Sequence, residues 1–587
     1  MSLGDWFEER TGYRAIVREA LDEPVPGGAR WAYVWGSALT LSFLVQVVTG
    51  WLLMAVYQPS ATSAWSSVAY ISQNVSWGWL VRGLHHYGAQ AMVVLLVMHL
   101  GQTAIYGAYK KPREMNWLLG LGLMSLTLGF ALTGYLLPWD QKGYWATKVA
   151  TNIAGSVPLI GGWTQRLLVG GAEYGHLTLT RFYTLHVAIL PLGVLVLLAA
   201  HIALFRKHGV TPPRKADLSR VDRFHPKQLA RDLLIGLVVL GIVFALTLRS
   251  HGAHLDAPAD PASDYPARPE WYFLSLFEAL KYVPGHFEWI IAAGIPLVAG
   301  GYLVLLPFID RKPGSSLAAR LVWLMPLLLG LAGTVALTVL SMRKDAADSE
   351  YQKARTLAEK RAARALELAR GGVPPAGPLA MLAADPQTRG PELFDKHCAS
   401  CHKLGEHVPP DGKVTAPDLT GYGTEKWVLA LLDNPDAPAF FGKTPFAGMM
   451  PSVTRPPKDP DAAQYFTKMK PEEMKAIAAF LVSEAQGKSK KGMPGEKMVR
   501  ERCTSCHRLD GKSDDPESLA PELRGWASVR WIEEQIKNPG SGKTYPPGAM
   551  AKDLKGHMPA FQDELEAQEI SLLSRWLYEQ ATGASPH

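Results

Sequence analysis

Cysteine is scarce in this chain of 587 residues, which contains only four. All four lie in two identical frames, Cys398-Ala-Ser-Cys401-His402 and Cys503-Thr-Ser-Cys506-His507. No cysteine is left for a structural disulfide or for the ligands of an iron–sulfur cluster. Whatever chemistry the cysteines perform must therefore take place within these two short frames.

Charged residues are sparse in the first half of the chain. Long uncharged runs fill residues 30–342, whereas residues 343–587 are polar and rich in Lys, Pro and Gly. We expect the first half to lie in a lipid bilayer and the second to be soluble. The formal net charge of +7 does not indicate a nucleic-acid partner, because the basic residues lie mainly in loops between apolar runs and in the polar half.

The N-terminus lacks an apolar segment followed by a small-residue cleavage site. Residues 1–29 are instead charged and amphipathic, which argues against a signal peptide. We expect this segment to lie on the cytoplasmic membrane surface.

Seven apolar runs are each long enough to cross a hydrocarbon layer of roughly 30 Å as a helix. The predicted spans are residues 31–57, 78–106, 117–137, 180–205, 229–248, 289–308 and 321–342. The predicted fold is all-α, with a seven-helix transmembrane bundle followed by two small α-helical domains. We divide the bundle into a four-helix part, residues 30–209, and a three-helix part, residues 210–344.

The loops between the spans predict their orientation. Basic residues follow the second, fourth and sixth spans: Lys110, Lys111, Arg113, Arg206, Lys207, Arg214, Lys215, Arg220, Arg223, Arg311 and Lys312. By the positive-inside rule these loops and the N-terminus are cytoplasmic, and seven crossings put the polar half outside. The CxxCH frames agree independently, because bacteria attach haem covalently outside the cytoplasmic membrane. We expect a multi-pass protein of the bacterial cytoplasmic membrane.

The polar half contains an internal repeat. Cys398 and Cys503 are 105 residues apart, Ala-Pro-Asp-Leu at 416 and Ala-Pro-Glu-Leu at 520 are 104 apart, and Trp427 and Trp531 are also 104 apart. Two tandem copies of one small helical domain, residues 386–487 and 488–587, fit this pattern. Residues 345–385 are charged and Ala-rich and then Pro/Gly-rich, which predicts a short solvated helix and a flexible tether.

Two histidine pairs lie inside the apolar half. His85 and His99 are fourteen residues apart in one predicted helix, and His186 and His201 are fifteen apart in another. Fourteen helical residues rise about 21 Å in nearly four turns, so each pair presents imidazoles from one face at two membrane depths. A single such histidine is more often buried and hydrogen-bonded, but two pairs at matched spacing predict the axial ligands of two haem groups.

Glycines in two other predicted helices repeat the same spacing. Gly36 and Gly50 are fourteen apart, as are Gly120 and Gly134. Glycines in membrane helices usually serve helix packing. A porphyrin needs neighbouring backbone without side chains, so the matched spacing favours haem contact at the two histidine levels.

The CxxCH frames predict two covalently attached haem c groups. Cys398 and Cys401, and Cys503 and Cys506, would form the thioethers, while His402 and His507 would bind iron. A zinc half-site is the nearest alternative, but zinc needs two more ligands at a comparable spacing. Met-Pro follows each frame, so we assign Met450 and Met558 as sixth ligands, in preference to a core or surface role.

A carboxylate and aromatic residues meet in the loop between the fifth and sixth spans, in Pro269-Glu270-Trp271-Tyr272-Phe273-Leu274. At the membrane border, Glu270 could accept a proton from a quinol while aromatic walls hold its ring. An interfacial aromatic belt with an incidental acid explains the residues equally well.

The membrane half resembles cytochrome b of the cytochrome bc complexes, particularly the chloroplast and cyanobacterial form, over residues 1 to about 342. The matching stretches are DWFEER at 5–10, GWLVR at 78–82, KKPRE at 110–114, TGYLLPWDQKGYW at 133–145, TRFY at 180–183 and the PEWY segment at 269–272. That form is split into two chains after the fourth helix, whereas this chain is continuous. The polar half resembles class I cytochrome c domains.

The resemblance implies roles for particular residues. His85 and His186 would ligate the outer of two non-covalent b haems, and His99 and His201 the inner one. Glu270 and Tyr272 would serve quinol oxidation, with Pro269 and Trp271 beside the quinone. Arg82 and Arg113 would face haem propionates, and Arg206 would lie at the inner quinone site, although membrane anchoring explains these arginines equally well. Val34 stands where the chloroplast form has a cysteine that tethers an extra haem, so we expect no third covalent haem.

The resemblance implies a core subunit of a quinol:cytochrome c oxidoreductase that couples electron transfer to proton translocation. Its Rieske iron–sulfur protein must be a separate chain, and other small membrane subunits, a homodimer and a soluble or membrane-bound cytochrome or oxidase acceptor are expected partners. The alternative is a membrane-anchored tetrahaem electron conduit for another quinone-linked dehydrogenase.

Overall fold

The computed structural model describes residues 1–171, 173–213, 215–312, 316–458, 460–464, 466–549 and 557–585. It forms two compact units, residues 1–379 and 380–587. In the described ranges the only strands are a short antiparallel pair, β1 (Pro24–Pro26) and β2 (Val221–Arg223). The predicted all-α class is confirmed.

Seven helices among the described residues are long and apolar enough to cross a membrane. Each overlaps one predicted span, and the ends differ by a few residues. They are α3 (Trp35–Met54), α5 (Gly78–Tyr106), α6 (Glu114–Leu136), α9 and α10 (His176–Thr184 and Leu190–His208, joined by a π turn), α11 (Leu229–Arg249), α13 (Ile295–Ile309) and α14 (Leu317–Ala347).

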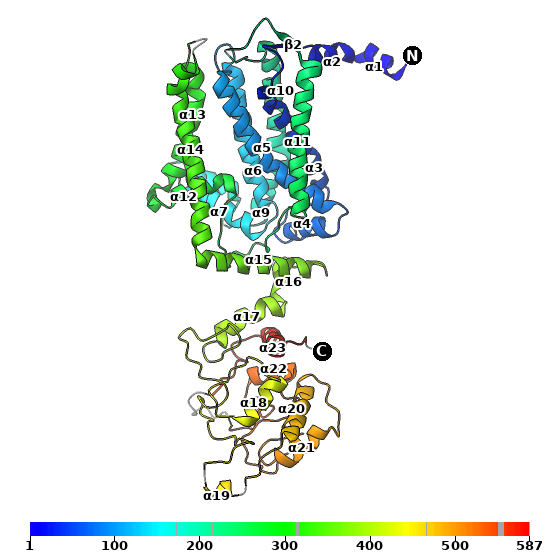
Figure 1. Cartoon of the computed structure of the whole chain (residues 1–587), viewed down its shortest axis with the longest axis vertical. Helices are drawn as coiled ribbons and strands as arrows, with labels where there is room; N and C mark the ends of the chain where they lie inside the picture. Colours follow the sequence, from blue (N-terminus) through cyan, green and yellow to red (C-terminus); the bar gives the residue numbers. More distant parts are fainter. Residues whose placement is uncertain are drawn as a thin grey trace. The chain divides into compact units, whose positions relative to one another are not determined.

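Contacts between spans far apart in the sequence build the bundle. Helix α3 packs along α5, α6 packs along α10, and α11 packs against both α3 and α5, while α14 packs against α12 (Leu274–Leu280) (Figure 1). Helix α5, which carries His85 and His99, is therefore flanked by the glycine-bearing α3. Helix α10, which carries His201 and follows the π turn with His186, is flanked by the glycine-bearing α6.

The basic loops gather at one end of the bundle, which we call the β-sheet end. Helices α1 (Leu3–Thr11) and α2 (Tyr13–Leu21) and both strands lie there (Figure 1). Buried Asp310 at this end accepts from Tyr109 over 2.6 Å, Lys110 over 2.7 Å and Arg320 over 3.0 Å. Arg214, one of the basic loop residues of the sequence analysis, lies outside the described residues. One end of the bundle thus combines the N-terminus with the basic loops.

The opposite end, which we call the α7 end, carries shorter helices. They are α4 (Ala64–Gln73), α7 (Gln141–Gly155), α8 (Gly161–Val169), α12 and α15 (Ser349–Ala369). Helix α7 starts where Asp140 accepts a hydrogen bond from the Gly143 amide over 2.8 Å, a typical N-cap. This cap fixes the direction of the first turn of α7.

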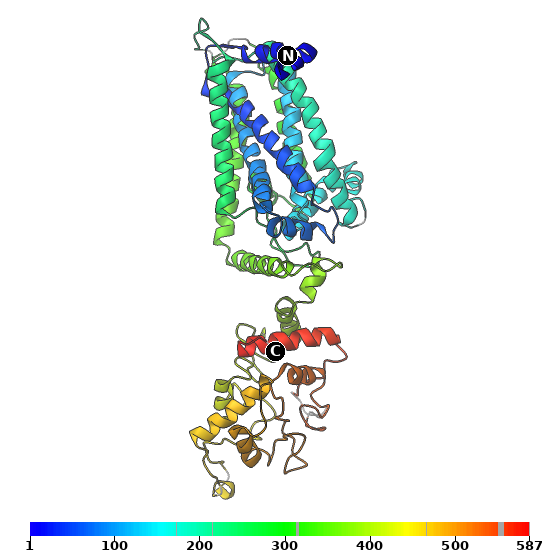
Figure 2. The same ribbon diagram turned by 90° about the vertical axis from the view of Figure 1, so that its right-hand side faces the viewer.

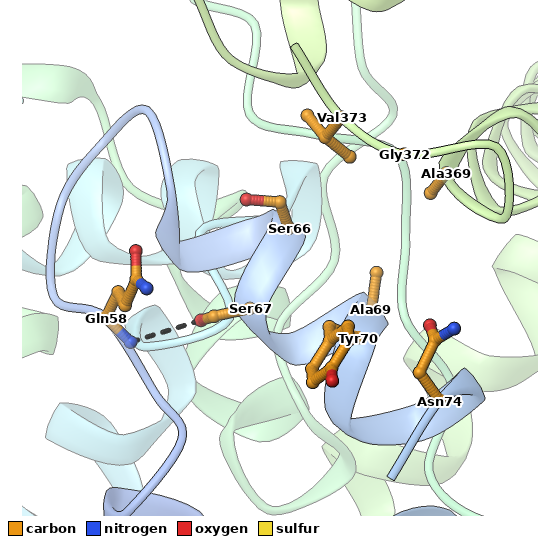
Figure 3. A pocket seen from close by; sticks show the side chains of 9 residues that line it. All are labelled: Gln58, Ser66, Ser67, Ala69, Tyr70, Asn74, Ala369, Gly372 and Val373. Carbon is orange, nitrogen blue, oxygen red and sulfur yellow. Dashed lines mark hydrogen bonds between the residues drawn. The ribbon is translucent and has the colours of Figure 1, made fainter. Parts of the chain in front are cut away.

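Residues 345–385 form more structure than the expected solvated helix and tether. Helix α15 buries Ala362 and Ala365, and Gln73 in α4 donates to Leu366 O over 2.9 Å. After α15 the chain faces α4 across a small cavity, with Ala369, Gly372 and Val373 on one side (Figure 3). The chain therefore follows the membrane unit well beyond α14, because α15 has an apolar face to bury.

The second unit holds both sequence repeats. Its helices are α16 (Pro378–Ala383), α17 (Pro386–His397), α18 (Glu425–Asp433), α19 (Pro460–Ala463), α20 (Pro471–Ala485), α21 (Pro494–Arg502), α22 (Val529–Lys537) and α23 (Ala567–Thr582). One hydrophobic core runs through both repeats and includes Phe394, Phe480, Trp526 and Trp576. The repeats are thus parts of a single compact unit.

Candidate functional site

The four membrane histidines form two facing pairs. The ring centroids of His85 and His186 are 6.3 Å apart, and those of His99 and His201 are 6.4 Å apart. An imidazole nitrogen binds a metal at about 2 Å, so two imidazoles on opposite sides of one metal have centroids roughly 6 Å apart. Each pair has the spacing needed to hold one haem iron between its rings.

Each of the four predicted glycines lies against one of these histidine rings. A Cβ on Gly50 would lie 3.3 Å from His85 Cε1, and one on Gly134 would lie 2.6 Å from His186 Cε1. Gly36 and Gly120 approach the other pair, with 3.3 Å to His99 Cε1 and 3.4 Å to His201 Cε1. The glycines therefore make room for the imidazoles themselves, and a larger residue would press on the ring.

Two threonines that sequence reasoning missed hold the His85–His186 pair. Thr49 Oγ1 lies 2.9 Å from His85 Nδ1, and Thr133 Oγ1 lies 3.0 Å from His186 Nδ1. Both residues directly precede a histidine-facing glycine, so the repeated Thr-Gly pair was a usable signal. Occupying Nδ1 leaves Nε2 as the metal-binding nitrogen.

The His99–His201 pair is held differently. His201 Nδ1 lies 3.0 Å from the carbonyl oxygen of Asn116, whereas buried His99 Nδ1 has no hydrogen-bond partner in the part of the chain that the structure describes. The two pairs thus share their spacing and their glycines, but they differ in the hydrogen bonds that orient the rings.

Glu270 lies at the α7 end, where Lys142 of α7 donates to its Oε1 over 2.8 Å. Tyr135 and Tyr272 lie close enough to interact electrostatically with the carboxylate. The Tyr135 hydroxyl is buried and has no hydrogen-bond partner within the described ranges. Because Tyr135 follows Gly134, which faces His186, this group of residues lies beside the His85–His186 pair.

The loop carrying Glu270 is fixed on both sides. Before it, Arg268 Nε donates to both carboxylate oxygens of Asp345, over 3.1 and 3.0 Å, and its guanidinium lies 4.3 Å from the ring centroid of Tyr351 in α15. After it, the Trp271–Phe273 turn leads into α12, with Trp271 itself 38% exposed. The Glu270 carboxylate therefore sits on a loop anchored to α14 and α15.

The three predicted arginines have protein partners in this structure. Arg82 donates to the carbonyls of Ala253 and His254 over 2.7 and 2.6 Å, and Arg113 donates to the His208 carbonyl over 2.6 Å. Arg206 lies 3.8 Å from Glu23 and its side chain is 44% exposed. Their roles toward haem propionates or quinone stay predictions.

The two CxxCH frames follow α17 and α21 directly, so the helix ends position the thiols. Cys398 is buried, Cys503 is half-buried, and Cys401 and Cys506 are exposed. Burial raises the pKa of Cys398 to about 12 and that of Cys503 to about 11, which keeps these thiols protonated. No cluster of three or more His, Cys, Asp or Glu side chains able to hold a metal occurs among the described residues, so the zinc alternative gains no further ligands.

The Ala-Pro-Asp/Glu-Leu segments of the repeat orient the two frame histidines. His402 Nδ1 lies 2.9 Å from the Pro417 carbonyl, and His507 Nδ1 lies 3.2 Å from the Pro521 carbonyl. Burial lowers the pKa of both histidines. The neutral imidazole with a free Nε2, which is the form that binds iron, is therefore favoured.

Two further kinds of group near the frames suit a bound haem c: a buried hydrogen-bond donor for a propionate, and methionine sulfurs that could bind the iron. Trp531 Nε1 is buried without a hydrogen-bond partner in the described ranges, which leaves it free to donate to a propionate. Met450 packs against the core while its neighbour Met449 is 59% exposed. Met558 also packs against the core, and its sulfur lies 3.6 Å from Gln535 Nε2.

Known families match most of the chain. The description "Cytochrome b/b6/petB" matches residues 20–209, "Cytochrome b(C-terminal)/b6/petD" matches residues 258–354, and "Cytochrome c" matches residues 387–484 and 493–580. The matched ranges follow the two units of the structure and the two sequence repeats.

Relatives named cytochrome b6 match about a third of the chain. Cytochrome b6 of Gracilaria tenuistipitata var. liui is 42% identical over 209 residues, which are 36% of this chain and 97% of the relative. Cytochrome b6 of Emiliania huxleyi is 40% identical over 212 residues, 36% of this chain and 99% of the relative. A solved structure described as "Hyperthermophilic respiratory Complex III" covers 61% of this chain and 95% of its own, with 29% identity and a TM-score of 0.51.

Proposed function

The chain belongs to the cytochrome b/b6 family and continues into two cytochrome c domains, and from this premise we propose that it is the core of a quinol:cytochrome c oxidoreductase. Membership implies a multi-pass membrane protein that carries haem b and haem c. The observation that carries the finer proposal is the position of Glu270 beside Lys142 and Tyr135, next to the His85–His186 pair.

The proposed haem complement is two b groups and two c groups. His85 with His186 and His99 with His201 would hold the b haems, and the CxxCH frames with Met450 and Met558 would hold the c haems. Bound haem supplies reversible one-electron redox chemistry. The protein contributes ligand spacing, the glycine clearances and, for every ligand histidine except His99, a hydrogen bond that sets the imidazole tautomer.

Glu270 would act as the base in quinol oxidation. A carboxylate within hydrogen-bond reach of a quinol hydroxyl can take its proton, and the anchored loop keeps the carboxylate at the α7 end. Pro269, Trp271 and Tyr272 would border the ring, while the unpartnered Tyr135 hydroxyl offers a donor to a quinone oxygen. A simple electron conduit has no need of such a base.

The proposed orientation places the β-sheet end on the cytoplasmic side of a bacterial cytoplasmic membrane. The basic loops and the N-terminal helices share that end, as the positive-inside rule requires. The c domains would then lie outside. A separate Rieske protein, small membrane subunits, a second copy of the complex and a cytochrome or oxidase acceptor are the proposed partners, and Arg206 would lie near the inner quinone site.

Purification of the intact complex tests this proposal. We expect two b haems and two c haems per chain by pyridine haemochrome analysis, together with a co-purifying subunit that shows a Rieske-type electron paramagnetic resonance signal. A preparation that oxidises no quinol and contains no iron–sulfur subunit would instead support the conduit alternative.

A further inference from the structure

Lys142 reaches the candidate base from an element remote in sequence. Its Nζ donates to Glu270 Oε1 over 2.8 Å, and the two side chains are 36% and 12% exposed. We propose that Lys142 is a positioning residue, whose ammonium holds the Glu270 carboxylate at the place where a quinol hydroxyl would bind. This inference rests on the proposed function.

The other groups around Glu270 do not supply a comparable positive charge. His86 of α5, Tyr135 of α6 and Tyr272 also interact with the carboxylate. Burial, followed by the nearby carboxylate of Glu270, raises the pKa of Tyr272, so this phenol stays neutral. Burial alone would lower the pKa of Lys142, but the Glu270 carboxylate outweighs it and raises that pKa overall. Lys142 therefore remains an ammonium group over the working pH range.

In the proposed step a quinol O–H bond breaks and a new O–H bond forms on the Glu270 carboxylate. The adjacent ammonium orients the carboxylate for this transfer. Without the ammonium, the Glu270 side chain would lose the 2.8 Å contact that orients it.

The test compares Lys142→Met, Lys142→Arg and, as a matched control, Lys148→Met in the intact complex. Lys148 lies on the same helix and contacts the Trp145 ring at 4.5 Å. For Lys142→Met we expect kcat to fall about tenfold while KM for quinol stays near the wild-type value. Lys142→Arg should restore most of the rate, and Lys148→Met should change neither quantity.

An unchanged kcat in Lys142→Met, no rescue by Lys142→Arg, or an equal effect of Lys148→Met would overturn the positioning role. If the wild-type complex oxidises no quinol at all, the proposed function fails instead. The two failures are therefore distinguishable.

The second unit carries an independent inference, because its terminal helices pair across the two repeats. Helix α17 of the first repeat packs on α23 of the second, and α20 of the first packs on α21 of the second (Figures 1 and 2). Gly390 in α17 faces Trp576 in α23, and Gly495 in α21 faces Phe480 in α20. The two glycines stand at equivalent positions, each eight residues before the first cysteine of its frame.

The connection between the repeats explains this pairing. Only residues 486–493 separate α20 from α21, and helices joined by so short a loop usually pack as an antiparallel neighbour pair. Helix α21 therefore occupies the apolar face of α20, and α17 and α23, at the two ends of the unit, are left to pair with each other.

Polar and aromatic contacts also join the two repeats. Arg389 in α17 lies 2.8 Å from Glu569 in α23. Buried Glu484 at the end of α20 accepts from Arg524 Nη1 over 2.5 Å and from the Gly525 amide over 2.6 Å. Tyr422 packs on Trp526, with ring centroids 5.1 Å apart.

From these contacts we infer that the two c repeats form one interlocked unit, in which neither repeat is complete without a terminal helix of the other. The two frames are then held at a fixed separation, so the unit acts as a single dihaem carrier rather than as two mobile domains. The inference rests on the helix contacts, and the proposed haem content is needed only because the tests detect the c haems.

Proteolytic cleavage between the repeats tests the interlock in the intact complex. Residues 490–492 are exposed, and a specific protease site placed there would cut the chain without removing a helix. We expect the cut protein to keep both c haems in one particle during size-exclusion chromatography in detergent, and to separate only in denaturant. Release of a monohaem fragment with α21–α23 under native conditions would overturn the inference.

Gly390→Leu provides a second test, because a Cβ at this position would lie 2.3 Å from Trp576 Cγ. We expect this change in the first repeat to weaken methionine ligation in both repeats, seen as one shared denaturant transition of the c-haem absorbance at lower concentration than wild type. Lys396→Leu, on the exposed side of α17, is the matched control. Two separate transitions, with only the first repeat affected, would contradict the interlock.

Discussion

The membrane bundle and the c unit hold their candidate haem ligands in contrasting ways. In the bundle each iron would be held by residues about one hundred positions apart, and the clearances come from two further helices. In the c unit each frame keeps its cysteines and histidine within five residues, and the orienting proline carbonyl follows 14 or 15 residues later. Histidine ligation is thus a tertiary property in the bundle and a local property in the c unit, whereas the proposed ligands Met450 and Met558 follow their frames by about fifty residues.

The helices that support these ligands show the reverse contrast, because the pairing of the bundle helices follows from sequence spacing and that of the c-unit helices does not. The bundle helices pair as the matched His and Gly spacings predict, because a membrane fixes their direction and depth. The c helices exchange between the repeats, because the short connection after α20 decides which apolar face α21 covers. Local ligation therefore does not imply a locally closed domain.

The largest expected effect comes from removing a bundle ligand. His186→Asn leaves His85 alone at its level, so we expect loss of one b haem, with the ratio of b to c haem falling to half. Pyridine haemochrome analysis measures the ratio, and retention of both b haems would show that another residue ligates this level.

Adding a methyl group at the glycines that face the histidine rings should destabilise the bundle to a degree that depends on the available space. Gly134→Ala places a Cβ 2.6 Å from His186 Cε1, whereas Gly120→Ala places one 3.4 Å from His201 Cε1. We expect Gly134→Ala to destabilise the haem-loaded bundle by about 1–3 kcal/mol through overpacking, while Gly120→Ala stays near wild type. Thermal bleaching of the b-haem absorbance compares the two, and equal behaviour would contradict the ring contact.

A smaller effect is expected from the threonine that orients His186. Thr133→Val removes a hydrogen bond worth about 1 kcal/mol and frees the imidazole to change tautomer. We expect haem retention at this level to weaken about 10-fold or more, measured by haem loss to an apo-globin acceptor. Thr127→Val is the matched control on α6, since Thr127 Oγ1 donates to the Leu123 carbonyl over 2.9 Å.

The smallest expected effect is a pH dependence confined to the c unit. The Gly492 amide, then Arg500 and Arg524, lower the pKa of Glu496 from 4.5 to about 2. A carboxylate with a lowered folded-state pKa stabilises the fold above its ordinary pKa, and this contribution is lost as the pH falls from about 4.5 towards 2. Glu496→Gln should flatten the acid decline of c-unit stability, monitored by c-haem absorbance, and leave bundle stability unchanged.

The sequence predicted the spans and the two facing histidine pairs, because both depend on the spacing of residues within single helices. The CxxCH frames are recognised directly as short sequence motifs. The sequence did not predict the Lys142–Glu270 ion pair, since residues 128 positions apart meet only through the packing of α7 on the loop that carries Glu270. Nor did it predict the packing of α15. The many charged residues of this helix indicated a solvated helix, although Ala362 and Ala365 on one face are buried. Thr49 and Thr133 could have been found from the repeated Thr-Gly pair.

The central claim is that the α7 end of the bundle oxidises quinol through Glu270. Glu270→Gln in the purified complex keeps the size of the side chain and removes its ability to take a proton. With the iron–sulfur subunit present, we predict that quinol-driven reduction of the c haems falls at least 100-fold while the haem content stays at wild type. Reduction at the wild-type rate would contradict the account.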